Sequence, residues 1–114
     1  MMVPRDKYNS GHYTWGNHCD SWILTESEGL SVKQELMPPG TREKLHFHHH
    51  AQQFFYILKG EAKFYVSGDR IKVKEGQGLL IEAGTRHYIA NESGADLEFL
   101  VTSQPSTTAD RIEI

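Results

Sequence analysis

Two blocks of the sequence, each opened by a glycine, place three histidines where a single metal ion could bind all of them. His46 and His48 follow Gly40 and are separated by one residue, and His87 closes the later block that begins at Gly84. Residues two apart in an extended strand point to the same face, so one strand can direct both imidazoles at one ion while His87 joins them from another strand. Neutral imidazole is a preferred ligand of zinc, copper, iron and nickel. The two blocks therefore predict a metal site inside a β-barrel.

The rest of the chain alternates short extended segments with turn residues, which is typical of an all-β fold. Apolar and polar side chains alternate along most of these segments, and the residues between them are those that favour turns. We expect strands at residues 21–25, 30–36, 45–50, 53–58, 61–66, 71–73, 79–81, 87–90 and 97–102.

A chain of 114 residues has room for one domain of normal size. We expect residues 1–20 to form an N-terminal arm, residues from about 21 to 102 to form the barrel, and residues 103–114 to form a tail. The tail lacks the apolar pattern of a core element, so we expect it to be mobile.

The composition excludes several classes of partner. The formal net charge is −3 and no basic stripe runs through the chain, which argues against nucleic acid. No apolar run approaches the roughly 20 residues that cross a membrane, and the first residues lack the apolar centre of a signal peptide. The single cysteine, Cys19, cannot form an internal disulfide, and we expect a cytoplasmic protein.

The spacing of the two blocks resembles the two sequence motifs of the cupin superfamily over roughly residues 36 to 92. The first motif has five residues between Gly40 and His46, one before His48, four before Gln53 and six before Gly60. The second has five residues between Gly76 and Glu82, one before Gly84, two before His87 and three before Asn91. The resemblance implies a small single-domain cupin whose fold is a double-stranded β-helix, also called a jelly-roll barrel.

Two positions depart from the family pattern. Gln53 stands where most metal-binding cupins have a glutamate ligand, and Glu82 stands where a proline usually opens the second turn. The second departure alters only a turn, which Ala83 and Gly84 can still make.

The resemblance implies that His46, His48, Gln53 and His87 bind one divalent transition metal ion, which could be iron, manganese, nickel or zinc. Glutamine offers one neutral oxygen, so ion and ligands would sum to +2, whereas a glutamate would bring the sum to +1. The higher charge favours an anionic substrate or an anion held on the metal. The alternative is that Gln53 only forms hydrogen bonds nearby and leaves a site of three histidines.

For other polar residues, the sequence gives weaker evidence of a role at the metal or substrate site. His50 shares the parity of His46 and His48 but lies near the strand end, where it could be a spare ligand or carry protons at the rim. Three further side chains, Tyr65, Arg86 and Tyr88, could orient a substrate. Parity with His87, however, directs Arg86 and Tyr88 away from the metal.

Residues 53–58 are apolar on both faces, so both faces of this strand must be covered. If Gln53 points into the barrel, alternation directs Phe54, Tyr56 and Leu58 outward. The cover is either this chain's own residues, such as Trp22 and Leu24, or a second subunit. The resemblance favours a homodimer.

The predicted function is that of a metal-binding cupin, an enzyme acting on a small polar or anionic metabolite. The resemblance implies chemistry like that of dioxygenases or sugar isomerases, and no catalytic residue is assigned. The alternative is a non-catalytic binding or sensor protein, favoured by the loss of the carboxylate at Gln53, which removes the most obvious general base. A third reading, an epimerase-like protein with a histidine base, does not require three converging histidines.

Overall fold

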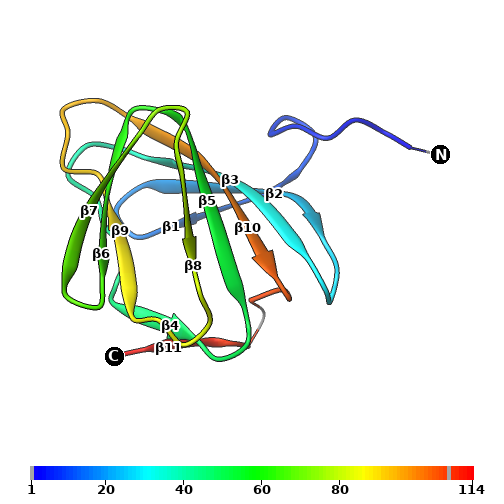
Figure 1. Ribbon diagram of the computed structural model, residues 1–114. Helices are drawn as coiled ribbons and strands as arrows, with labels where there is room; N and C mark the ends of the chain where they lie inside the picture. Colours follow the sequence, from blue (N-terminus) through cyan, green and yellow to red (C-terminus); the bar gives the residue numbers. More distant parts are fainter. Residues whose placement is uncertain (1, 108) are drawn as a thin grey trace.

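In the computed structural model, which describes residues 2–107 and 109–114, two antiparallel sheets face each other and form a barrel (Figure 1). In spatial order, the first sheet contains β1 (Gly11–Trp15), β2 (Cys19–Glu26), β3 (Ser31–Met37), β10 (Leu97–Gln104), β5 (Gln52–Lys59) and β8 (Gly78–Ile81). The second contains β11 (Arg111–Glu113), β4 (His46–His48), β9 (His87–Ala90), β6 (Glu61–Val66) and β7 (Asp69–Lys74). The predicted all-β, double-stranded β-helix fold is confirmed.

The core lies between the two sheets and is built from the inward residues of alternating strands. The Phe55 ring contacts the Phe64 ring of the opposite sheet at 5.0 Å between centroids and the Phe99 ring at 5.7 Å. Side chains that are at most 5 % exposed complete this core: Met37, Ile57, Ala62, Val73, Ile81, Ile89, Leu97 and Val101. Apolar burial of this kind contributes ~25 cal/mol per Å² and is the main force that joins the sheets.

Strand β5 has the two-faced character expected from its sequence. Gln53, Phe55 and Ile57 are buried, whereas the alternate side chains of Phe54 and Tyr56 are 44 % and 40 % exposed. The outward apolar face of β5 is therefore only partly covered by this chain, and Gln53 faces the interior as predicted.

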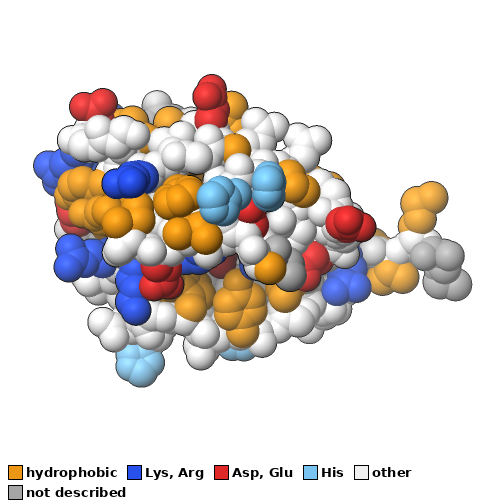
Figure 2. Space-filling model, turned by 90° about the horizontal axis from the view of Figure 1, so that it is seen from below, with side chains coloured by type: hydrophobic (Ala, Val, Ile, Leu, Met, Phe, Trp, Pro, Cys, Tyr) orange, Lys and Arg blue, Asp and Glu red, His pale blue; other side chains and the backbone are white. Residues whose placement is uncertain are grey.

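Charges of both signs are interspersed on the lower face of the barrel, where hydrophobic side chains and exposed histidines lie between them (Figure 2). Among the described residues, no helix is long and apolar enough to cross a membrane.

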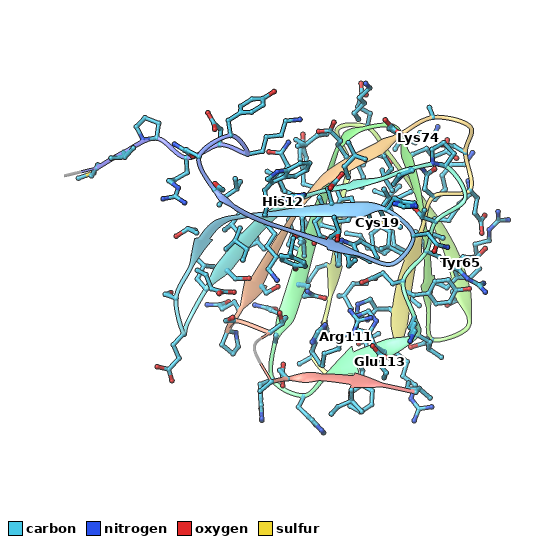
Figure 3. The ribbon with its side chains drawn as sticks, turned by 180° about the vertical axis from the view of Figure 1, so that it is seen from behind. His12, Cys19, Tyr65, Lys74, Arg111 and Glu113 are labelled. Atoms are coloured by element: carbon cyan, nitrogen blue, oxygen red, sulfur yellow. The ribbon has the colours of Figure 1, made fainter. Side chains whose placement is uncertain are left out.

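Two strands lie in segments that we did not expect to form strands. Strand β1 lies within the expected arm and pairs with β2, and β11 lies within the expected tail and pairs with β4 along the lower edge of the barrel (Figure 3). Both are edge strands that are held by backbone hydrogen bonds, which require no alternation of apolar residues. The Asp110 carboxylate also accepts hydrogen bonds from the backbone N–H groups of His50 and Ala51, which fixes the start of β11.

The turn of the second motif is tied directly to the histidine strand. Gly84 adopts a φ of +80°, which L side chains rarely adopt, and its N–H donates to the His48 carbonyl at 2.7 Å. The Thr85 N–H donates to the Glu82 carbonyl at 3.2 Å, so Ala83 and Gly84 make this turn without a proline, as expected.

The last motif residue, Asn91, is fully buried and orders the turn between β9 and β10. Its Nδ2 donates to the carbonyls of Met37 and Ala95, each at 2.8 Å. An asparagine with both amide hydrogens satisfied pins β9, and with it His87, against β3.

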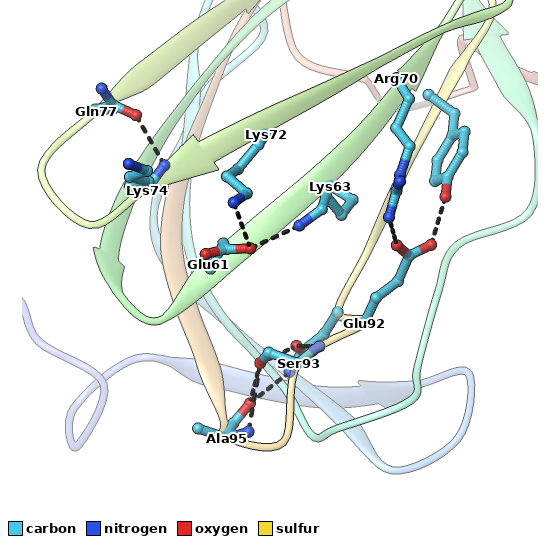
Figure 4. Close-up of polar contacts among 11 residues, drawn as sticks. Glu61, Lys63, Arg70, Lys72, Lys74, Gln77, Glu92, Ser93 and Ala95 are labelled. Carbon is cyan, nitrogen blue, oxygen red and sulfur yellow. Dashed lines mark hydrogen bonds and ion pairs between the residues drawn. The ribbon is translucent and has the colours of Figure 1, made fainter.

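Polar contacts outside the barrel join neighbouring strands (Figure 4). Glu61 pairs with Lys63 at 2.6 Å and Lys72 at 3.8 Å, and Glu92 pairs with Arg70 at 2.6 Å and accepts the Tyr65 hydroxyl. The carboxylates of both pairs are open to solvent, which screens the charges, so these pairs contribute little to stability. The barrel depends on its core rather than on these contacts.

Candidate metal centre

The three predicted histidines lie together between β4 and β9. His46 and His87 are direct partners in the pairing of these strands, with ring centroids 4.4 Å apart. The His48 ring lies 5.0 Å from that of His46 and 6.0 Å from that of His87. One nitrogen of each histidine lies within 4.8 Å of the others, and the three residues are 1 %, 4 % and 1 % exposed. Nitrogens this close together could bind one ion, with zinc–nitrogen bonds of about 2.0–2.1 Å.

Local backbone groups set the orientation of two of the rings. The Nδ1 atoms of His46 and His87 lie 2.7 Å and 2.8 Å from the carbonyls of Lys44 and Thr85, each two residues upstream. A carbonyl only accepts, so each Nδ1 carries the hydrogen and each Nε2 carries the free lone pair. Such a hydrogen bond commonly fixes the tautomer of a metal-binding histidine.

Several buried polar atoms of this cluster have no hydrogen-bond partner in the part of the chain that the structure describes. They are Nδ1 of His48, Nε2 of His87 and Oε1 of Gln53. The Gln53 amide nitrogen donates to Ser103 Oγ at 3.1 Å, which leaves its carbonyl oxygen free. Unpaired buried acceptors are costly unless a cation or donor meets them. Imidazole nitrogen and amide oxygen are both ligands of divalent transition metals, so these residues fit one such ion.

Burial holds the imidazoles in the form that can bind a metal. Burial lowers the pKa of His46 and of His48 to about 4, with His46 and His87 adding to the effect at His48. Burial also lowers the pKa of His87, against the hydrogen bond to Thr85, which raises it. All three rings are therefore neutral at pH 7 and their nitrogens are available as ligands.

A cavity of about 190 Å³ borders the cluster, and His46, His48 and Gln53 are in its wall. A second cavity, of about 640 Å³, adjoins it. The side chains that line both cavities are Tyr13, Glu35, Glu43 and Arg111. Two carboxyl groups, a guanidinium and a phenol therefore line the region where the larger cavity meets the smaller cavity at the histidines.

Glu43 is a site residue that the sequence analysis missed. Its Oε2 lies 3.9 Å from His46 Nε2 and 3.4 Å from an Arg111 nitrogen, and its Oε1 accepts the Ile89 N–H at 3.1 Å. Burial raises the pKa of Glu43, while Arg111 and His87 lower it. Glu43 is three residues from His46, which parity along one strand would place on the opposite face. The chain bends at Leu45, and this bend returns Glu43 to the face of His46. In the sequence, only the position of Glu43 inside the first motif indicated a role at the site.

Glu35, on β3, is the second acid of the cavity wall. Burial raises the pKa of its carboxyl to about 7, and the neighbouring Glu43 adds to the rise. Glu35 shares its inward parity with the buried Met37, which is the signal that could have identified it.

The remaining candidates lie away from the histidines. His50 is exposed at the edge of a different cavity, beside Asp110, and is not part of the cluster. Tyr88 stacks on Tyr65 outside the barrel, with ring centroids 4.6 Å apart, and Arg86 is in the wall of the same outer pocket. The prediction that Arg86 and Tyr88 point away from the metal agrees with this arrangement.

Comparison with known proteins gives one family model, one similar protein sequence and two similar structures. A family model described as a cupin domain matches residues 34–103. The oxalate-binding protein of Thermotoga maritima is 38 % identical over 82 residues, which are 68 % of each chain. The structure of a predicted oxalate decarboxylase from Thermotoga maritima superposes with a TM-score of 0.83 at 24 % identity, covering 92 % of this chain and 100 % of that one. The polyketide cyclase RemF of Streptomyces resistomycificus superposes with a TM-score of 0.84 at 16 % identity, covering 100 % and 86 %. At these identities the two structures show a shared fold alone.

The pKa values predict how metal affinity depends on pH. Unperturbed histidine, with a pKa of about 6.5, would lose metal below about pH 6. Because His46 and His48 have pKa values of about 4, protons compete only at lower pH, and affinity should hold down to about pH 5. Calorimetric titration of zinc between pH 4 and 8 measures this. A steep loss of affinity beginning at pH 6 or above would contradict it.

The same shifts predict that the metal-free protein loses stability on acidification. The unfolded chain binds protons at His46 and His48 from about pH 6.5 downward, and the folded chain does so only near pH 4. The free energy of unfolding should therefore decrease as the pH is lowered from about 6.5 to about 4, and urea denaturation would measure this.

Replacing Gln53 by glutamate tests whether its oxygen binds the ion. If it does, Gln53→Glu should bind cobalt more tightly and bind azide at the cobalt more weakly, each by about tenfold, because one negative charge joins the site. Gln52→Glu is the matched control, since it adds the same charge at the exposed neighbouring position. If Gln53→Glu and Gln52→Glu have equal affinities for cobalt and for azide, Gln53 is not a ligand and the site consists of three histidines.

Proposed function

The chain belongs to the cupin family, and we propose that it is a metal-dependent enzyme that acts on a small carboxylate. The proposed ligands of its divalent ion are His46, His48, His87 and Gln53. The observation that carries the proposal is the set of unpaired buried polar atoms on His48, His87 and Gln53, beside a cavity whose wall also contains two carboxyl groups.

A divalent ion held there would polarise a ligand oxygen, and iron or manganese would add redox chemistry. The protein's own contribution begins with charge. Its four proposed donors are neutral, so no protein carboxylate is directly on the ion, and Lys33 and Arg111 line the same cavity. These features favour an anionic ligand. The relative from Thermotoga maritima, described as an oxalate-binding protein, supports a small carboxylate.

Glu43 is the proposed proton acceptor. Its Oε2 is 3.9 Å from the Nε2 of His46, so a ligand group held beside that nitrogen is within reach of the carboxylate. The backbone N–H of Ile89 holds the other carboxylate oxygen, which keeps Oε2 directed at the site. Burial raises its pKa above that of a surface glutamate, and a carboxylate with a raised pKa is a stronger base at neutral pH.

Glu35 is suited to pass that proton onward. Its pKa of about 7 lets it exist in both protonation states near neutral pH, and it lines both cavities as Glu43 does. The base that seemed absent when Gln53 replaced glutamate is thus supplied by a neighbouring acid rather than by a metal ligand.

A second candidate function is binding without turnover. The specific observation in its favour is that the similar protein from Thermotoga maritima is described by what it binds. Both functions predict a metal and an anion in the cavity, and only the enzyme requires that Glu43 take part in a reaction.

Turnover by a Glu43 variant separates the two functions. The protein is loaded with iron or manganese and assayed for consumption of oxalate, malonate and related small carboxylates. Wild type should consume at least one of them, and Glu43→Gln should lower kcat by about 10²- to 10⁴-fold, as expected for loss of a general base. Metal content and carboxylate binding should persist. Glu82→Gln, an exposed residue in the second turn, is the charge-matched control.

If wild type binds a carboxylate tightly with each metal and consumes none, the protein is the binding module. If Glu43→Gln turns over as wild type does, the general base is another residue.

We also propose that a second copy of this chain covers the outer face of β5 and β8. Four neighbouring apolar side chains on this face, Phe54, Tyr56, Leu58 and Leu80, are 44 %, 40 %, 39 % and 49 % exposed. They come from paired strands and so form one continuous patch.

Light scattering coupled to size-exclusion chromatography tests this contact. Wild type should elute with twice the mass of one chain, and Phe54→Lys should elute as a monomer. Leu45→Lys is the control, because Leu45 is 39 % exposed at a different surface. A monomeric wild type at micromolar concentration would contradict the proposal.

A further inference from the structure

We propose that Arg111 binds the carboxylate group of the ligand. The ligand carboxylate then replaces the carboxylate of Glu43, which Arg111 contacts in the ligand-free protein. This inference rests on the proposed function, because it requires a carboxylate in the cavity. It adds the residue that recognises this group, and that residue lies outside residues 34–103, which the cupin model matches.

The backbone places Arg111 beside the histidines. Strand β11 pairs with β4 so that Arg111 lies opposite His48 and Glu113 lies opposite His46. Directly paired residues of antiparallel strands direct their side chains to the same face, so the C-terminal strand adds a cation and an anion to the histidine side of the barrel. Figure 3 shows Arg111 and Glu113 next to each other at this strand. Arg111 lines both cavities and therefore stands where they meet.

The guanidinium of Arg111 is only loosely bound by its present partners. One Nη is 3.4 Å from Glu43 Oε2, and Nε is 3.7 Å from Glu113 Oε1. Charge-assisted hydrogen bonds are usually 2.7–2.9 Å long, and arginine can hold a carboxylate with two parallel bonds. Neither contact has that geometry among the described residues. Within the described part of the chain, the five N–H donors of Arg111 make one long hydrogen bond, which leaves a fork available to a ligand carboxylate.

Glu43 can give up Arg111 and still keep one hydrogen bond. Its Oε1 keeps the hydrogen bond from the Ile89 N–H, and its Oε2 lies 3.9 Å from the Nε2 of His46, a nitrogen proposed to bind the cation. A carboxylate that reaches Arg111 thus replaces a weak partner and leaves the remaining contacts of Glu43 in place.

Lys33 is the other cation of the smaller cavity, and its contacts make it a weaker candidate. Its ammonium donates to the Tyr13 hydroxyl at 3.0 Å and lies 5.3 Å from the centre of the Tyr13 ring. A carboxylate would have to compete with both contacts, whereas at Arg111 it competes with a long hydrogen bond to Glu43 and a 3.7 Å ion pair with Glu113.

The direct test is the affinity of oxalate for zinc-loaded protein, measured by calorimetry. Zinc has no redox chemistry, so binding is observed without electron transfer to or from the metal. Arg111→Gln should weaken oxalate binding by about tenfold or more, the usual loss when a hydrogen bond to a charged group is removed, and should leave zinc affinity unchanged. Arg111→Lys keeps the charge without the fork and should be intermediate. Arg42→Gln, which removes a cation that lines only the larger cavity, should change affinity by less than about twofold.

A double-mutant cycle separates exchange from a structural role of Arg111. If oxalate displaces Glu43, Glu43→Gln should strengthen oxalate binding severalfold in the wild-type background, because the competing carboxylate is gone. The same substitution should have no such effect in the Arg111→Gln background. An arginine that merely supports the fold would show neither the gain nor its dependence on Arg111.

The possible failures are distinguishable. If zinc-loaded wild type binds oxalate and Arg111→Gln binds it equally well, Arg111 is not the recognition residue, and the proposed function stands. If wild type binds zinc but neither oxalate nor malonate, the carboxylate ligand is wrong and both proposals fall. If Glu43→Gln weakens oxalate binding in both backgrounds, the exchange is overturned.

Discussion

The pairing of β4 with β9 is the contact on which the site depends. It sets His46 opposite His87, and the two-residue period of β4 adds His48 on the same face. Burying three imidazoles is unfavourable unless each of their nitrogens has a partner. The surrounding structure is arranged around that requirement: the Gly84 turn bonds to the His48 carbonyl, and two backbone carbonyls hold His46 and His87 in one tautomer.

The carboxylate of this site has a different place from the one that the family pattern implies. The position usually taken by a glutamate ligand holds Gln53, whose amide nitrogen is bound by Ser103. The acid is instead Glu43, beside His46 and held by Ile89 and Arg111. Under the proposed function, this separation leaves a neutral donor set on the ion and a carboxylate that does not bind it and can accept a proton. The same proposal has the anion attracted by the charge of the centre, with the base beside it.

The sequence predicted the features that follow from local periodicity. Alternation gave the inward direction of Gln53 and the outward direction of Phe54, and motif spacing gave the histidine cluster and the turn at Gly84. It could not predict features that depend on backbone pairing at an edge or on a bend. Strand β11 has no apolar alternation, so Arg111 seemed part of a tail, and the bend at Leu45 reverses the parity that would have placed Glu43 outside. Glu43 and Arg111 were therefore visible only once the chain was folded, whereas the parity of Glu35 with Met37 was already present in the sequence.

The central claim is that the histidine cluster and Gln53 hold one metal ion. X-ray absorption spectroscopy of the wild-type protein, loaded with one equivalent of zinc, tests it most directly because it reports the atoms around the ion. We predict three imidazole ligands at about 2.0–2.1 Å and at least one oxygen at about 2.0–2.2 Å, with the multiple-scattering features of histidine rings. A spectrum with one imidazole or none, or protein that fails to retain zinc on gel filtration, would contradict the account.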